Sequence, residues 1–339
     1  MKYRILKTTV ALALSLCIGL SAGNAEAAEK KDYVFGVGVP GGVWEMVGTA
    51  IAKVLNQYAS FRLVPVTVTT NMSNPVSLSK GEMAFAMGSF DVSERAFRGE
   101  DIFKGKETQG TAQVLSIYDN VMGFLVLGNS KLTAMDEITD KTIIASPPGN
   151  YVNNVAYLNA MKAAGILKAD PAKVAKNFHQ VTWAQSLDQL VDGNADIALA
   201  TGFPYNGMAD SVITTKGARF IPVSKDPAAF ERFRAEFDKK NREVTMQAIP
   251  AGTYATTTEP VWGYVYYSCI YAGKSVDNAV VKEFVELAIK HMKEIAAIHP
   301  SAAGLTIEAN KRNLESGIMQ KDRMHPAAVE YFKGLGIIK

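Results

Sequence analysis

DYVFGVGVPGGVWEMVGTAIAKVLNQ, residues 32–57, carries the pattern from which the rest of the fold is built. Positions 33–37 form a short apolar run with an aromatic and β-branched residues, which predicts a buried strand. Three glycines and a proline follow within positions 38–42 and predict a tight loop. Beyond that loop, apolar residues recur at the three-and-four spacing of a helix with one buried face. They are Val43, Val47, Ala50, Ile51, Val54 and Leu55.

The glycine loop between this strand and this helix is predicted to form one wall of a ligand cleft. Glycines without side chains let the unpaired N–H groups of the helix face a small anion or carboxylate, and the helix dipole favours negative charge there. The candidate ligand-binding residues of this loop are Gly41, Gly42, Val43 and Trp44. Trp44 can either stack on a ligand or pack between helix and sheet, and the sequence favours neither.

The same loop also matches a dinucleotide-binding fingerprint. Gly36, Gly38 and Gly41 satisfy G-x-G-x-x-G between a strand and a helix. However, Pro40 has no N–H to offer a pyrophosphate. The next predicted strand, residues 63–69, runs into Thr-Thr-Asn instead of the acidic residue that binds a ribose. We therefore expect no cofactor and keep a nucleotide-cofactor enzyme as an alternative.

Residues 1–27 have the pattern of a targeting segment. A basic start is followed by an apolar run at 10–20 and by Ala25-Glu26-Ala27, which has the form of a cleavage site. The apolar run is shorter than the roughly 20 residues that a membrane span needs. We expect an exported, periplasmic protein cleaved near Ala27. Removal of residues 1–27 lowers the formal charge of the chain from +3 to +1, which argues against nucleic acid as a partner.

The order of strand, loop and helix recurs further along the chain. Predicted strands at 83–88, 142–146 and 196–201 each lead through a short loop into a predicted helix. Strands that alternate with helices indicate an α/β fold with parallel sheets, whose ligands bind outside the carboxyl ends of the strands. The four loops are therefore expected to meet at one central cleft. Their candidate ligand-binding residues, with those after strand 63–69, are Asn71, Asn74, Ser89, Asp91, Gly149, Asn150, Tyr151, Asn153, Gly202, Phe203, Pro204 and Tyr205.

Most of these side chains are uncharged. Asparagines donate and accept hydrogen bonds, which suits a carboxylate or an amide, although turn and cap roles explain many asparagines. Tyr151, Phe203 and Tyr205 are large aromatics in loops, which favours cleft lining. Asp91 and Arg95 are spaced to pair with each other on a helix surface. Because the four loops contain no arginine, backbone N–H groups and helix ends are expected to do most of the binding of an anion.

Two long apolar runs, residues 121–127 and 261–272, are predicted to connect two domains. The mature chain exceeds what one core usually supports, so two domains are expected. A chain that leaves by the first strand and returns by the second gives a discontinuous domain I, residues 28–126 and 267–339, and a continuous domain II, residues 127–266. Two crossing strands would form a hinge. The alternative is two core strands of a single large sheet.

The last part of the chain is predicted to be scaffold. Residues 277–298 have the pattern of one long amphipathic helix, ended by His299-Pro300. A charge-rich helix is predicted at 231–240 and a final helix at 327–335. The ionic face of the charge-rich helix is expected to be solvated.

The order of these pieces resembles that of a known family. They are GVGVPGGVWEMVGTAIAKVLN, GEMAFAMGSFDV, IYDNVMGFLVLGNSKLTAMDEITDKTIIASPPGN, LVDGNADIALATGFP, IPAGTY, IAAIHPSAA and MHPAAVEYFKGLGI. Over nearly its whole mature length the chain resembles the TAXI family of solute-binding proteins, the extracytoplasmic receptors of a class of TRAP transporters. The resemblance lies in the shared order and spacing of the pieces.

The resemblance implies a two-domain, periplasmic-binding-protein-like fold of type II that closes over a small organic solute. It also implies delivery to a TRAP permease driven by an ion gradient, and solutes such as glutamate or 2-oxoglutarate. We expect a monomer. This chain departs from the family at Glu45, where the family has an uncharged residue, and at Ser89 and Phe90. It also has Asn150 and Tyr151 in place of the usual continuation of the third loop.

An enzyme is the competing class. The sequence contains no G-x-S-x-G elbow, no paired cysteine motif and no H-E-x-x-H motif, and the four histidines lack metal-ligand spacing. Glu45 and Asp91 have no evident basic or nucleophilic partner in the sequence. We therefore expect a receptor without catalytic residues or a metal site, and keep an exported hydrolase as an alternative.

Overall fold

The computed structural model describes residues 30–106, 108–240 and 244–338. The predicted targeting segment, residues 1–27, lies outside these ranges. The backbone of Asn71 is described, whereas its side chain is outside the description.

The opening stretch forms the predicted strand, loop and helix. β1 (Asp32–Gly38) becomes buried toward its end, and α1 (Val43–Tyr58) buries the predicted apolar face from Val47 to Leu55. Gly38 has a φ of +119°, and a Cβ on it would lie 2.9 Å from the Cβ of Trp44. Only glycine fits this close approach of the loop to the helix.

The other helices and strands follow in an alternating order. They are β2 (Arg62–Thr67), η1 (Asn71–Ser73), α2 (Asn74–Ser79), β3 (Phe85–Ser89), α3 (Phe90–Arg98), η2 (Asp101–Phe103), β4 (Thr111–Val126), η3 (Met135–Glu137), β5 (Ile144–Ser146), η4 (Pro148–Asn150), α4 (Tyr151–Ala163), α5 (Pro171–Lys176), β6 (Phe178–Gln180), α6 (Trp183–Val191), β7 (Ile197–Phe203), α7 (Gly207–Lys216), β8 (Arg219–Ile221), α8 (Pro227–Lys240), β9 (Val244–Ile249), β10 (Val261–Gly273), α9 (Asn278–Lys290), α10 (Met292–Ile298), η5 (Pro300–Gly304), α11 (Ile307–Glu315), η6 (Lys321–Arg323) and α12 (Pro326–Gly334).

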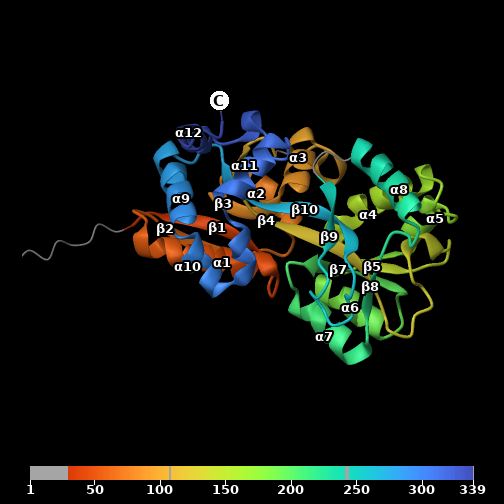
Figure 1. The fold of residues 1–339 in the computed structure, drawn as a ribbon. Coiled ribbons are helices and arrows are strands. Elements are labelled where there is room, and N and C mark those ends of the chain that lie inside the picture. Colours follow the sequence, from red (N-terminus) through yellow and green to blue (C-terminus); the bar gives the residue numbers. More distant parts are fainter. Residues whose placement is uncertain (1–29, 107, 241–243, 339) are drawn as a thin grey trace, which may run out of the picture. The chain divides into compact units, whose positions relative to one another are not determined.

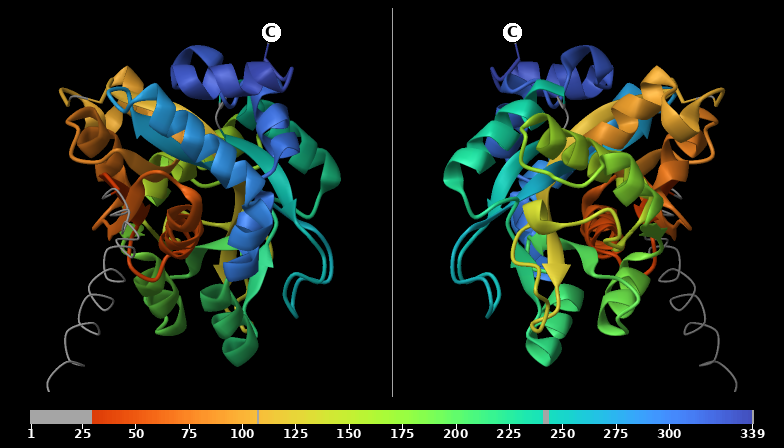
Figure 2. Two further views of the ribbon diagram at one scale, coloured as in Figure 1. Left: turned by 90° about the vertical axis from the view of Figure 1, so that its left-hand side faces the viewer. Right: turned by 90° about the vertical axis from the view of Figure 1, so that its right-hand side faces the viewer.

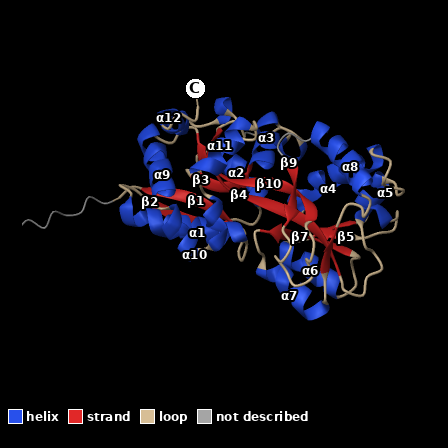
Figure 3. Cartoon of the chain, viewed as in Figure 1, coloured by secondary structure: helices blue, strands red, loops and turns tan. Residues whose placement is uncertain are grey.

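The strands join into a mixed sheet with the order β2-β1-β3-β10-β4-β7-β5-β6, with β8 paired to β4 and β9 paired to β10 (Figure 1). β1, β2 and β3 are parallel, and so are β5, β6 and β7. β4 and β10 are antiparallel to their neighbours. Helices flank the strands (Figure 3). The chain therefore has the predicted α/β class with a parallel set of strands at each end of the sheet.

β4 and β10 each take part in both ends of the sheet. β10 pairs with β9 through residues 261–266 and with β3 through residues 268–272. β4 pairs with β10 from residue 111 and with β7 and β8 near its end, at residues 121–126. These strands include the two apolar runs predicted to connect domains. The structure joins them in one continuous sheet, and the division into two domains remains a prediction.

The predicted long helix at 277–298 was wrong, because the chain forms two helices, α9 and α10, separated at His291. His291 has non-helical dihedral angles, φ −103° and ψ 17°. Its ring stacks on Tyr58 of α1 with centroids 3.8 Å apart, and its Nδ1 lies 2.7 Å from Glu294 Oε1. Both helices pack against α1 (Figure 2). The apolar pattern is therefore divided between two shorter helices that both contact α1.

No described helix is long and apolar enough to cross a membrane.

Candidate functional site

A cavity of about 670 Å³ lies where the loops after β1, β3, β5 and β6 meet. The loop after β1 contributes Val39 to Gly42 and the first turn of α1 contributes Trp44. These residues come from one end of the sheet, whereas those after β5 and β6 come from the other end. The described lining includes these predicted ligand-binding residues: Gly41, Gly42, Trp44, Ser89, Asp91, Gly149, Asn150 and Asn153.

Four helices begin at this cavity. α1, α3 and α4 begin there without a hydrogen bond from a capping side chain, and α6 begins with a capping box of Thr182 and Gln185. The N-terminus of a helix carries the positive end of its dipole and unpaired backbone N–H groups. The backbone around the cavity therefore favours a negatively charged group on a ligand.

Trp44 is fixed to the sheet and lines the cavity at the same time. Its indole Nε1 donates a hydrogen bond to Ser268 Oγ on β10 at 2.8 Å. Its ring meets Tyr266 edge-on, with centroids 6.1 Å apart. The two interpretations that the sequence left open for Trp44 are therefore compatible, because one face of the half-buried ring packs and another is available to a ligand.

Among the described residues that line the main cavity, Asp91 is the only one with a charged side chain. Its Oδ2 accepts hydrogen bonds from Arg95 Nη2 at 3.2 Å and from Asn153 Nδ2 at 3.0 Å. The Asn153 bond joins α3 to α4, which belong to opposite ends of the sheet. The Asp91–Arg95 pair is buried, with side-chain exposures of 5% and 8%, so its predicted surface position was wrong. Asp91 Oδ1 has no hydrogen-bond partner among the described residues.

Glu45 places a second carboxylate at the start of α1. The backbone N–H of Gly41 donates to its Oε2 at 3.3 Å, so the side chain folds back over the glycine loop. A carboxylate in the first turn of a helix is stabilised by the helix dipole. The negative charge of Glu45 therefore reduces the positive potential that the N-terminus of α1 produces at the cavity.

The predicted asparagines have different surroundings. Asn150 lines the cavity, and its Nδ2 donates to the buried Tyr264 hydroxyl at 3.2 Å. Asn74 is buried away from the described lining, and its Nδ2 donates to the Met87 carbonyl at 2.9 Å. Asn74 therefore holds α2 against β3, as a structural asparagine does.

The fourth predicted loop does not contribute its predicted residues to the described cavity lining. Phe203 and Tyr205 are 39% and 55% exposed, and Tyr205 stacks on Tyr254 instead. Gly202 and Pro204 also lie outside the described lining. Thr201, Asn206 and Met208, which flank this loop, reach the site in their place. Tyr151 likewise packs edge-on against Phe178, with centroids 5.6 Å apart.

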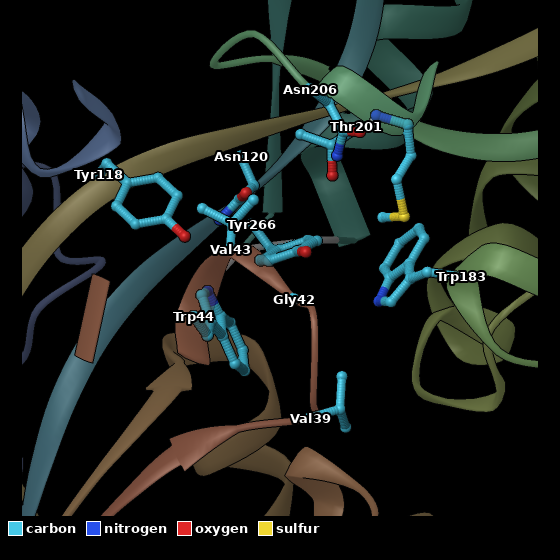
Figure 4. Close-up of a pocket in the computed structure, with 11 residues that line it drawn as sticks. Val39, Gly42, Val43, Trp44, Tyr118, Asn120, Trp183, Thr201, Asn206 and Tyr266 are labelled. Carbon is cyan, nitrogen blue, oxygen red and sulfur yellow. Dashed lines mark hydrogen bonds between the residues drawn. The ribbon is translucent and has the colours of Figure 1, made fainter. Parts of the chain in front are cut away.

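A smaller cavity of about 50 Å³ adjoins the main one (Figure 4). The two cavities share several lining residues, among them Trp44, Trp183 and Tyr266. Val43, which was predicted to bind the ligand, lines the smaller cavity. Tyr118 and Asn120 of β4 also line it. Burial raises the pKa of Tyr266, and the charge of Asp91 adds to this rise, so the Tyr266 hydroxyl stays protonated at neutral pH.

Besides Thr201, Asn206 and Met208, sequence reasoning missed two further groups of site residues. Thr182 to Gln185 follow β6, which is too short to show strand periodicity. Their S/T-x-x-E/Q-like capping pattern was the available signal. Tyr118, Asn120 and Tyr266 lie on the long strands β4 and β10, where an alternating pattern does not reveal which residues face a cavity.

Residues 35–336 match the family model described as the NMT1-like family, so the chain belongs to that family. No curated protein matches the chain.

Solved structures share the fold at low sequence identity. The ligand-binding component of an ABC-type import system from Staphylococcus aureus, solved with zinc bound, has a TM-score of 0.53 and 12% identity over 89% of this chain and 98% of that one. A binding-protein component of an ABC phosphonate transporter from Pseudomonas aeruginosa has a TM-score of 0.53 and 8% identity over 91% and 95%. A structure described as a periplasmic transporter has a TM-score of 0.50 and 10% identity over 92% and 98%. These likenesses show that the chain shares the mixed α/β fold of those structures.

Among the described residues, no three His, Cys, Asp or Glu side chains are placed to hold a metal ion.

Proposed function

We propose that this protein is an exported solute receptor that binds a small organic solute in the main cavity and delivers it unchanged to a membrane permease. The observation that carries this proposal is the cavity itself, because loops from both ends of one sheet line it. Its volume of about 670 Å³ is in the range of ligand pockets for small organic molecules.

The proposed solute is a carboxylate or an amino acid. Helix N-termini from both ends of the sheet favour a carboxylate at the cavity. Asp91 offers the opposite charge in the same cavity and suits the ammonium group of an amino acid. Trp44, Trp183 and Tyr266 supply apolar surface for the carbon skeleton.

The proposed partner is the membrane subunit of a TRAP transporter, driven by an ion gradient. The resemblance to the TAXI family in the order of the loops supports this partner. Two of the structural neighbours named above are instead described as components of an ABC-type import system and of an ABC phosphonate transporter. An ABC permease is therefore the second candidate partner.

Binding is proposed to close two domains, residues 28–126 with 267–339 and residues 127–266, about a hinge in β4 and β10. Both strands pair with both ends of the sheet, which is the connection that such a hinge needs. The Asn153–Asp91 hydrogen bond spans the cavity between the two proposed domains. A solute can shift this equilibrium only by its higher affinity for the closed form.

A thermal-shift screen of small carboxylates, amino acids and sugar acids tests the receptor function. A bound solute should raise the melting temperature of the mature protein, since a ligand at 100 times its Kd stabilises the folded state by about 2.7 kcal/mol. Mass spectrometry of the solute afterwards should recover it unchanged. Chemical conversion of the solute would favour the exported hydrolase, and the absence of any stabilising solute would contradict the receptor function.

Asn150→Asp should weaken the binding of a carboxylate solute at least about tenfold, because it adds a like charge to the cavity. The Asn150 side chain makes no capping hydrogen bond, so its replacement removes no cap and α4 should still form. Isothermal titration calorimetry measures the affinity and circular dichroism the fold. Asn159→Asp, on the exposed face of the same helix, is the matched control. Equal affinities in the two variants would show that the third loop does not bind the solute.

A further inference from the structure

The smaller cavity adjoins the main one and is lined in part by the strands that join the two ends of the sheet. The two cavities share the lining residues Val39, Gly42, Trp44, Trp183, Met208 and Tyr266. Beyond these, Tyr118 and Asn120 of β4 and Thr201 of β7 line the smaller cavity (Figure 4). Its described lining contains no charged side chain.

Several hydrogen-bonding groups at this cavity are engaged within the protein. Trp44 Nε1 and Asn120 Nδ2 both donate to Ser268 Oγ on β10. Asn206 Oδ1 accepts from the backbone N–H groups of Met208 and Ala209, at 3.0 and 3.2 Å. These bonds fix the walls of the cavity and hold Trp44 in place.

Tyr118 differs from them because its hydroxyl is buried and lacks such a bond. Its side chain is 3% exposed, and its hydroxyl makes no hydrogen bond with any described residue. Ser268 and Asn120 lie close enough to offset part of the rise that burial causes in the pKa of Tyr118, but they bond to each other, and neither has hydrogen-bond geometry toward the Tyr118 hydroxyl. Burial raises the pKa of Tyr118 well above its ordinary value, so the hydroxyl remains a neutral donor and acceptor. In Figure 4 this hydroxyl is directed from β4 toward Val43 and Tyr266.

A buried hydroxyl without a partner costs free energy that a suitable partner recovers. An apolar group in the smaller cavity would leave the Tyr118 hydroxyl without a hydrogen-bond partner, so the free-energy cost would remain. A charged group would lose its hydration without meeting an opposite charge, which costs more. A volume of about 50 Å³ accommodates a group of a few heavy atoms rather than a whole solute.

We propose that the smaller cavity is a specificity subsite that takes an uncharged polar group of the bound solute, a hydroxyl or a primary amide, hydrogen-bonded to Tyr118. The assignment rests on the proposed receptor function and adds which end group the solute carries. The main cavity then holds the carboxylate or amino-acid part, and the subsite distinguishes solutes of equal size by the charge of their other end.

Tyr118→Phe tests the subsite, because it removes one oxygen and leaves the ring. The probes are two matched pairs, L-glutamine with L-glutamate and 4-hydroxybutyrate with succinate, measured by calorimetry. The wild-type protein should prefer the uncharged member of at least one pair. In the variant, affinity for that member should fall roughly two- to twelvefold, the range expected for one neutral hydrogen bond. Affinity for the charged member should stay unchanged.

Tyr267→Phe is the matched control, because Tyr267 lies on β10, outside the described lining of both cavities, and its hydroxyl pairs with Thr245 at 2.6 Å. Equal weakening of both members of a pair by Tyr118→Phe would overturn the subsite, since it would point to a bound water or to packing alone. Preference of the wild type for the charged members would also overturn it. So would the failure of glutamine and 4-hydroxybutyrate to bind while other solutes of the screen do bind. If no solute in the screen binds, the receptor function fails and the subsite falls with it.

Discussion

Arg323→Met should lower the free energy of unfolding by about 3–5 kcal/mol at pH 7, the usual cost of removing one partner of a buried ion pair. Arg323 Nε lies 3.2 Å from Glu94 Oε1, and the two side chains are 6% and 4% exposed. The guanidinium also lies over the Phe97 ring, 3.1 Å from its centroid. The substitution therefore leaves the Glu94 carboxylate in the core without its cation. Denaturant unfolding followed by circular dichroism measures the change.

The effect should depend on pH. Burial raises the pKa of Glu94 above its ordinary value, and Arg323 opposes this rise. Without Arg323 that pKa should rise further, so the folded variant should bind a proton more tightly than the unfolded chain. The variant should therefore lose more stability than the wild type as the pH rises from about 4 to 7. The same loss at both pH values would show that lost packing, rather than the unpaired carboxylate, causes the effect.

Arg62→Met is the matched control for an ion pair at the surface. Arg62 pairs with Asp32, and their side chains are 59% and 46% exposed. Exposed pairs contribute little because water screens them. If Arg62→Met lowered the free energy of unfolding as much as Arg323→Met does, burial of the ion pair would not determine the size of the loss.

Trp44→Ala should weaken solute binding by roughly 30-fold or more, the effect of removing an aromatic residue that dominates a binding site. The substitution removes apolar surface from the main cavity and from the wall that it shares with the smaller one. It also removes the hydrogen bond to Ser268, which retains its bond from Asn120. The protein should stay folded, because Trp44 is only half-buried. Calorimetry with the solute found in the screen measures the affinity.

Trp262→Ala is the control for the loss of a tryptophan as such. Trp262 is also half-buried on β10, but it packs on Phe230, with centroids 5.3 Å apart, and is absent from the described lining of both cavities. It should bind the solute as the wild type does. Unchanged affinity in Trp44→Ala would place the binding site outside the glycine loop.

The opening part of the fold could be predicted because its signals are local. The apolar run of β1, the glycine loop and the buried face of α1 all lie within residues 32–57. The full length of β4 could not be predicted, because its first half buries polar residues whose partners are distant in sequence. Asn310, for example, accepts from the Ser116 N–H at 2.7 Å and donates to the Ser116 carbonyl at 3.0 Å.

The candidate site could be predicted at the level of loops and less well at the level of side chains. The loops after β1 and β3 lie together because these two strands are parallel. β5 is parallel to β7 and runs in the opposite direction, so the carboxyl ends of the two sets of strands face each other at the middle of β4 and β10. Phe203 and Tyr205 were expected to line the cleft because exposed aromatics are costly. Tyr205 avoids part of this cost by stacking on Tyr254, and its hydroxyl donates to Asp210 at 2.7 Å. Such pairings between loops leave no local sequence signal.

β4 and β10 supply Tyr118, Asn120 and Tyr266 to the smaller cavity and also connect the two ends of the sheet. In the proposed receptor, solute selectivity and the stability of the sheet therefore depend on the same two strands. Engineering a new solute preference through these strands would disturb both properties at once. The turn after β6, with Thr182 to Gln185, reaches the cavity from a three-residue edge strand. It is therefore the place where new recognition can be built with the least damage to the framework.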